Sequence, residues 1–193
     1  MSKTISRILI FAGAALFLAA AVVLMYSYVE DYLAARRAQH VLEQVWGTGE
    51  TAQHVSVAAE NPEEVWGHPI IGIVSIPKLD VTLPVFSELT DELLEISVCR
   101  FTGEVLDKPQ RLIISGHNYR SHFGRLPALA LGDEVHFTTG ERVTYRYSVT
   151  EITEIPEQDT ITVHEGGDWD ITLLTCNADH TRRVLVRCRE IQN

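Results

Sequence analysis

Hydrophobic residues are distributed unevenly along this chain, with one long apolar run near the start and short alternating runs after it. From Ile8 to Val29 the sequence contains no charged residue and is dominated by Ile, Leu, Ala, Val and Phe. At about 1.5 Å of rise per residue, a helix of this length covers roughly the 30 Å of a bilayer core. The run predicts a signal-anchor transmembrane helix within residues 1–29. A cleaved signal peptide is less favoured, because its apolar core is usually about 7–15 residues long.

The charges beside this apolar run predict its orientation. Lys3 and Arg7 precede it, and Glu30 and Asp31 follow it. Basic residues favour the cytoplasmic side of a membrane span, so we expect a cytoplasmic N-terminus and an extracellular remainder. Of the 16 basic and 26 acidic residues, 14 basic and all 26 acidic ones follow the run, a formal charge of −12. This acidity argues against nucleic acid or anionic lipid headgroups as the main partner.

Residues 30–65 have the pattern of a spacer. A helix with sparse apolar positions, Leu33 among them, is expected to continue over 32–46. Residues 50–64 are polar, alanine-rich and aperiodic, which is typical of a mobile or loosely docked tether. We therefore expect an extracellular helical or flexible tether over 30–65 and a compact domain over 66–193.

Short runs of β-forming residues separated by turn residues fill this compact domain. The expected strands are 70–76, 81–86, 111–115, 134–138, 142–150, 170–176 and 183–189. A short helix is expected over 90–98 and a helical turn over 122–126. Seven or more short strands in so small a domain favour an all-β closed barrel, because closure removes exposed sheet edges.

One cysteine ends an apolar, strand-like run and is the candidate nucleophile. Cys176 closes Thr172-Leu173-Leu174-Thr175-Cys176, and a polar stretch follows it. A thiol of ordinary pKa is only a few per cent thiolate at pH 7, so a nucleophilic cysteine needs a nearby base or cation. Taken alone, the context favours a small hydrophobic residue at a strand end. With Cys99 and Cys188 the cysteines number three, so at least one thiol stays free or pairs between chains. The other two are expected to be semi-buried structural thiols, although a bond between them stays open at this point.

Of the eight histidines, three are candidates for a proton carrier, and His117 is the first of them. It follows an apolar strand and Gly116, where the backbone can turn and a side chain can project over a groove. His180, four residues after Cys176, is the alternative, and His122 is third. A single histidine is often merely solvated or structurally satisfied, so the residues alone do not decide between the three.

Strand parity separates two arginines near the C-terminus. In the last expected strand Val184 and Val186 share one face, and Arg183 lies on the other. If the apolar face points into the barrel, Arg183 points outward beside Cys176, whereas Arg182 has the inward parity. A planar, always charged guanidinium suits the stabilisation of an oxyanion. Arg183 is therefore the candidate, with Arg182 as the alternative.

The Thr-Leu-x-Thr-Cys run ending at Cys176, with Arg183 downstream and Gly116-His117 upstream, resembles the signature of the sortases. These are cysteine transpeptidases that attach secreted proteins to the Gram-positive cell wall. Other segments that resemble the family are 71–79, 83–86 and 131–135. The resemblance implies a closed eight-stranded sortase-type β-barrel with short helices. It also selects His117 over His180, and Arg183 over Arg182.

The resemblance implies a reaction as well as a fold. Cys176 would attack the threonine carbonyl of a Leu-Pro-x-Thr-Gly-like sorting signal, with Arg183 at the oxyanion and His117 protonating the departing amine. An amine of a peptidoglycan precursor or of a pilin would resolve the thioester. Thr175 is expected to contact the substrate backbone and Asn118 to orient His117. No cofactor or metal is expected.

Two questions stay open at the level of sequence. The subclass is unresolved, since residues 150–169 are too few for the large extra helix of class B, although Gly116-His117-Asn118-Tyr119 resembles that class. The alternative function is a non-catalytic cell-surface β-barrel that serves as a binding or scaffold module. An L,D-transpeptidase is disfavoured, because that family places its cysteine in a Ser-x-Gly-Cys-type turn and here Thr175 precedes Cys176.

Overall fold

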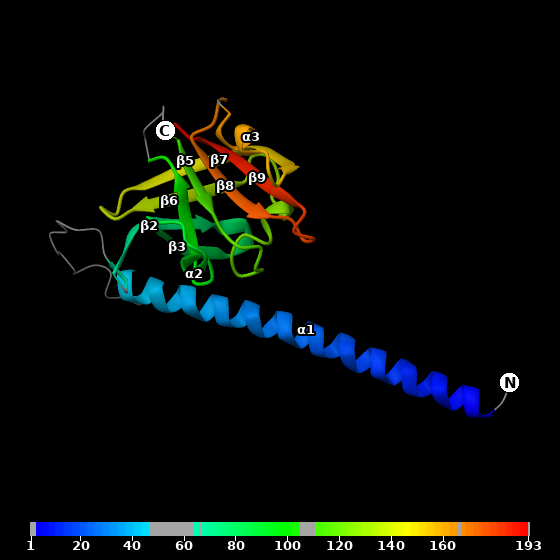
Figure 1. Ribbon diagram of the computed structural model, residues 1–193. Coiled ribbons are helices and arrows are strands. Elements are labelled where there is room, and N and C mark those ends of the chain that lie inside the picture. Colours follow the sequence, from blue (N-terminus) through cyan, green and yellow to red (C-terminus); the bar gives the residue numbers. More distant parts are fainter. Residues whose placement is uncertain (1–2, 47–63, 66, 105–110, 166, 193) are drawn as a thin grey trace.

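A long helix and a closed sheet of eight strands make up this computed structural model, which describes residues 3–46, 64–65, 67–104, 111–165 and 167–192 (Figure 1). The strands of the barrel are β2 (His68–Ile76), β3 (Val81–Phe86), β4 (Val98–Thr102), β5 (Leu112–Ser115), β6 (Glu134–Thr139), β7 (Thr144–Pro156), β8 (Ile171–Cys176) and β9 (Arg182–Glu190). A two-residue strand, β1 (Glu64–Val65), pairs with the start of β2. The predicted all-β barrel with an N-terminal apolar helix is confirmed.

The order of the strands around the barrel is β2-β3-β4-β5-β8-β9-β7-β6, and pairing of β6 with β2 closes the ring. The pairs β3–β4 and β5–β8 are parallel, and the others are antiparallel. Because β5 and β8 are parallel neighbours, the loops that follow them leave the barrel at the same end. This end carries the predicted site.

Alternation along each strand divides the apolar residues between the barrel interior and its outer face. Leu173 of β8 and Val184 and Val186 of β9 point inward and pack in the main core. Their neighbours Leu174 and Leu185 point outward. They are nevertheless buried, because α3 (Thr160–His164) and Trp169 cover this outer face. The middle of the outer face of β8 and β9 is therefore shielded from solvent.

Several local expectations differ from the structure. No strand was expected over β4, but it pairs with both β3 and β5. The helix expected over 90–98 is confined to α2 (Asp91–Leu94), which Thr90 caps by accepting from the backbone N–H of Leu93. The helical turn expected over 122–126 is a series of turns leading into the short 3-10 helix η4 (Leu126–Ala128). The helix α3 was not expected. Asp159 caps it through the backbone N–H of Thr162.

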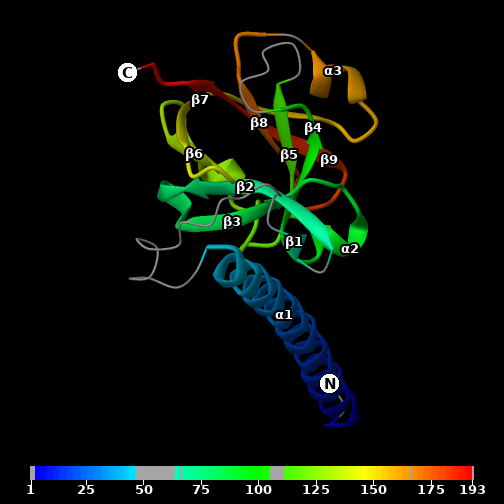
Figure 2. The same cartoon turned by 90° about the vertical axis from the view of Figure 1, so that its left-hand side faces the viewer.

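The predicted membrane span and the predicted helical part of the spacer form one continuous helix, α1 (Lys3–Trp46). It is long and apolar enough to cross a membrane, and the side chains described from Arg7 to Tyr28 are exposed, apart from position 9, which is not described. Its last part instead packs on the barrel through Ala34, Ala38, Val41 and Val45. Figures 1 and 2 show the C-terminal part of α1 beside β2, β3 and α2, whereas its N-terminal part extends away from the barrel. Residues 47–63 of the predicted tether lie outside the described residues.

The spacing of the docked residues explains why the sequence alone did not reveal the contact. Ala34, Ala38, Val41 and Val45 recur every three to four residues, the spacing of one helix face. Two of the four are alanines, which give a weak hydrophobic signal but allow close approach. Leu33, an expected apolar position, is 44% exposed.

Candidate active site

The central strand of the candidate site is β8, which ends at Cys176 between β5 and β9. Leu173 and Thr175 face the barrel interior, so Cys176 has the outward parity of Leu174. Its side chain is half-buried, and its thiol is free. Cys99 and Cys188 are also free, but both are fully buried. Burial raises the pKa of each of these two thiols to about 12, so neither competes as a nucleophile.

Arg183 lies directly opposite Cys176 in the antiparallel pair of β8 and β9. Directly opposed residues share one face of a sheet, with Cβ atoms roughly 5 Å apart. The guanidinium is turned towards the loop after β7: Nε donates to the carbonyl oxygen of Glu157 (3.3 Å), and Nη2 lies 3.7 Å from its carboxylate. Arg182 is more exposed and binds the backbone carbonyl of Glu154 (2.9 Å). Of the two arginines, Arg183 shares the outer face with Cys176.

His117 lies on the other side of Cys176, two residues after the end of β5. The pairing of β5 with β8 matches Ser115 to Leu174, and the backbone N–H of Gly116 donates to the carbonyl oxygen of Leu174 (3.0 Å). Continuing this register by two residues brings His117 level with Cys176. Neighbouring strands are about 4.8 Å apart. The structure thus brings His117, Cys176 and Arg183 to adjacent positions on three neighbouring chain segments.

Two glycines shape the loop that carries His117. A Cβ atom on Gly116 would lie 2.6 Å from Cγ1 of Val98 and 2.9 Å from the ring of Phe123. One on Gly124 would lie 2.0 Å from the carbonyl oxygen of Asn118. Only glycine permits these approaches, which hold residues 117–124 as a closed loop. The backbone N–H of Phe123 completes it by donating to the carbonyl oxygen of His117 (3.2 Å).

Asn118 joins this loop to the turn after β8. Its Nδ2 donates to the carbonyl oxygen of Asn177 (3.1 Å) and lies 3.4 Å from Nε2 of His180. His180, the alternative proton carrier, is exposed and has a left-handed backbone (φ 59°). Both candidate histidines are therefore near the end of β8. The described contacts of the Asn118 side chain fix the two loops to each other.

The ring of His117 belongs to a row of three rings. The ring centroid of Tyr119 is 5.2 Å from that of His117 and 5.4 Å from that of His122. Partial burial lowers the pKa of His117; the carboxylates of Glu95 and Asp91 oppose this effect. The neutral imidazole is thus the favoured form of His117 at neutral pH, before any proton is transferred to it.

His122 is completely buried, and neither of its ring nitrogens has a hydrogen-bond partner among the described residues. Burial, assisted by the neighbouring His117, lowers its pKa to about 4. A ring that is neutral and inaccessible at pH 7 cannot exchange protons with a substrate. His122 is therefore a structural residue of the loop.

Thr175 has a side chain that points into the barrel and is 1% exposed, with no partner for its hydroxyl among the described residues. It lies on the opposite face of β8 from Cys176. Any contact between Thr175 and a substrate would have to come from its backbone.

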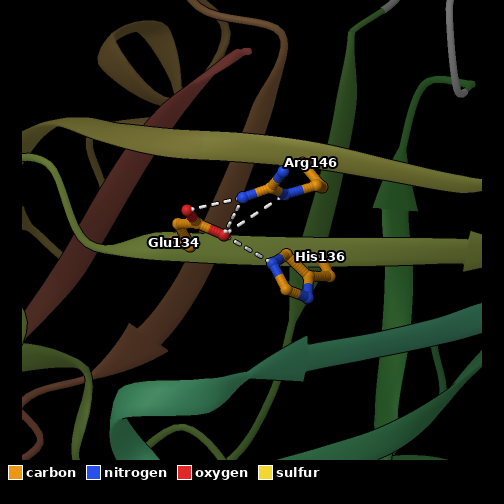
Figure 3. A network of polar contacts seen from close by, with 3 residues as sticks. All are labelled: Glu134, His136 and Arg146. Carbon is orange, nitrogen blue, oxygen red and sulfur yellow. Dashed lines mark hydrogen bonds and ion pairs between the residues drawn. The ribbon is translucent and has the colours of Figure 1, made fainter. Parts of the chain in front are cut away.

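His136 belongs to a separate polar network on β6 and β7 (Figure 3). Its Nε2 is 2.8 Å from Glu134, which also binds Nη2 of Arg146 at 2.8 and 2.9 Å. Hydrogen bonds from His136 and Arg146 lower the pKa of Glu134. Two strands, β7 and β9, separate β6 from β8. This network therefore takes no part in the candidate site. Within the described ranges no group of three or more His, Cys, Asp or Glu side chains could hold a metal ion.

Sequence reasoning missed two residues of the site. Glu157 holds the guanidinium of Arg183, but it lies 26 positions away in the chain and follows a strand whose length was underestimated. The ring of Tyr119 lies between the rings of two histidines, and its position two residues after His117 was the only signal. Neither contact follows from a local pattern.

Comparison with known proteins gives one consistent result. A family model described as the Sortase domain matches residues 74–191. Sortase A of Staphylococcus aureus is 27% identical over 92% of this chain and 90% of its own length. Sortase A of Bacillus anthracis is 29% identical over 61% of this chain, and the match spans 58% of that relative. The structure of a sortase D5 transpeptidase from Clostridium perfringens shares the fold, with a TM-score of 0.60, 20% identity and coverage of 81% of this chain and 97% of that one.

Proposed function

Because this chain belongs to the sortase family, we propose that it is a membrane-anchored cysteine transpeptidase with Cys176, His117 and Arg183 at its active site. One observation carries the proposal: Arg183 is directly opposite Cys176 in the pairing of β8 with β9. The register of β5 and β8, continued by two residues, would bring His117 level with Cys176. These groups supply a nucleophile, a proton carrier and an oxyanion partner.

Catalysis begins with transfer of the Cys176 proton to His117. The imidazole is neutral at rest, since burial lowers its pKa, and it is therefore ready to accept that proton. The resulting thiolate attacks the carbonyl carbon of threonine in a Leu-Pro-x-Thr-Gly-like signal. A carbon–sulfur bond forms, and the carbonyl oxygen takes up the negative charge of a tetrahedral intermediate.

Arg183 stabilises this oxyanion. Its guanidinium is permanently charged and bears several donors, so it can keep a contact with Glu157 while it donates to the substrate. The contact with Glu157 thereby holds the long side chain of Arg183 on the outer face of the sheet, which is also the face of Cys176. This reduces the conformational entropy lost when substrate binds.

The intermediate collapses when the threonine–glycine bond breaks. His117 donates its proton to the departing glycine amine, and a thioester between threonine and Cys176 remains. An incoming primary amine attacks the thioester, His117 accepts a proton from it, and the thiolate leaves. The acceptor amine belongs to a peptidoglycan precursor or to a pilin, and the donors are secreted proteins with C-terminal sorting signals.

The other predicted residues have supporting roles in this scheme. Asn118 couples the loop of His117 to the turn after Cys176, and so fixes the distance between base and nucleophile. Thr175 buries its side chain in the core and anchors the end of β8. The apolar part of α1 holds the enzyme in the cell membrane as a single span with a cytoplasmic N-terminus and an extracellular catalytic domain.

The test is cleavage of a Leu-Pro-x-Thr-Gly peptide in the presence of hydroxylamine. The full chain should release the glycine-containing fragment and form a threonine hydroxamate. Cys176→Ala should abolish both products. Cys99→Ala, which removes a buried thiol elsewhere, is the matched control and should retain activity below its unfolding temperature. A folded wild-type chain that cleaves no member of a sorting-signal library would favour the alternative, a non-catalytic surface module.

A further inference from the structure

The helix α1 contacts the loop of His117 directly. The backbone N–H of Ser121 donates to Oδ1 of Asp31 (3.3 Å), and its hydroxyl donates to the carbonyl oxygen of Asp31 (3.2 Å). Asp31 lies two residues after Val29, where the apolar run ends. The contact therefore joins the loop to α1 where the apolar part ends and the docked part begins.

Further along α1, towards its C-terminal end, the helix covers the buried ring of His122. The side chains of Ala34 and Ala38 are 1% and 3% exposed, and backbone groups of Ala34 and Ile96 lie close enough to His122 to affect its pKa. The ring is thus enclosed by α1, by its own loop and by the segment after α2. An alanine at position 34 lets the helix backbone approach this closely.

The enclosed ring of His122 supports Tyr119, which in turn packs against His117. Tyr119 also interacts with α1: after burial, the largest cause that raises its pKa is the carboxylate of Glu30. The contacts run without a break from α1 through His122 and Tyr119 to the imidazole of His117.

We propose that residues 31–45 of α1 are a positioning element of the active site, which holds the imidazole of His117 through Tyr119 and His122. Tyr119 and His122 are then positioning residues. The inference rests on the proposed function only in so far as His117 is the proton carrier. It also places the active-site end of the barrel next to the point where α1 leaves the membrane, so that a sorting signal still attached to the membrane is within reach.

The experiment follows the His117 imidazole by NMR in the full chain, labelled with ¹³C-histidine and held in detergent micelles, together with kcat and KM for the peptide. Ala34→Leu inserts a larger side chain between α1 and His122. Gln39→Leu, on the exposed face of the same helix, is the matched control. Tyr119→Leu removes the ring between the histidines, and Tyr119→Phe restores it.

In Ala34→Leu and Tyr119→Leu, His117 loses part of its burial, so its titration should move to higher pH and kcat should fall at least tenfold, with KM within twofold. Gln39→Leu and Tyr119→Phe should match the wild type in both respects. If Ala34→Leu fails to fold, Tyr119→Leu decides the question. A His117 titration that is the same in the wild type and in both disruptive variants would overturn the proposal. Because that titration needs no substrate, it remains informative even if the wild type cleaves no peptide.

Discussion

Replacing Val41 by alanine tests whether α1 is a structural part of the domain or a loose tether. Val41 is 0% exposed and packs with Val45, Ile70, Phe86 and Cys99. The substitution removes two buried methyl groups, each worth about 0.8 kcal/mol in transfer free energy, and leaves a small cavity. We expect the free energy of unfolding to fall by about 2 kcal/mol.

For a chain of this size, a loss of that magnitude lowers Tm by roughly 4–8 °C. Thermal unfolding of the full chain in detergent, followed by near-ultraviolet circular dichroism, would measure it. Leu33→Ala on the same helix is the control: Leu33 is 44% exposed, so the change should stay within about 0.5 kcal/mol. Equal Tm values for Val41→Ala and Leu33→Ala would show that α1 does not dock on the barrel, and the argument from its contacts would fail.

Three further predictions concern the site. Arg183→Lys should lower kcat/KM at least tenfold, because an ammonium group cannot both bind the Glu157 carbonyl and present a planar fork of donors. Arg182→Lys should keep a kcat/KM near that of the wild type. The opposite order of effects would transfer the oxyanion role to Arg182. Gly124→Ala should lower the free energy of unfolding in urea by more than about 2 kcal/mol, because the new Cβ would lie 2.0 Å from the Asn118 carbonyl oxygen. An unchanged free energy of unfolding would contradict this loop geometry. The pKa of His122 is lowered to about 4 in the folded state, so the unfolded state binds more protons between about pH 6.5 and 4. The free energy of unfolding should therefore decline by about 2 kcal/mol from pH 7 to pH 5. His122→Leu should flatten this pH dependence, and an unchanged slope in the variant would count against the role of His122.

Much of the fold could be predicted because its elements depend on local patterns of the sequence. The apolar run before Glu30 and the β-forming runs of β3 and β8 are recognisable from residue type and spacing along one segment. In contrast, β4 contains Arg100 and begins at Val98, soon after α2 ends at Leu94, so its pattern gives no strand signal. It becomes a strand because β3 and β5 offer hydrogen-bond partners on both sides.

The same distinction holds for the candidate site, where some residues could be predicted and some contacts could not. Cys176 and His117 could be selected from the residues and from the family signature, and strand parity placed Arg183 on the outer face with Cys176. The contact of Arg183 with Glu157, and the row of rings from His117 to His122, could not be selected. No periodic pattern encodes a contact between two loops.

Residue type and spacing along single segments were enough to predict the apolar span, the all-β class of the domain and the chemistry of its reactive groups. The folded arrangement was needed to show that the end of β5 lies beside the end of β8, and that α1 rests on the loop after β5. Strand order and helix docking depend on which surfaces exclude water from each other, and a local pattern does not specify the partner surface. In this chain the segments that meet can lie far apart, as Asp31 and Ser121 do at 90 positions.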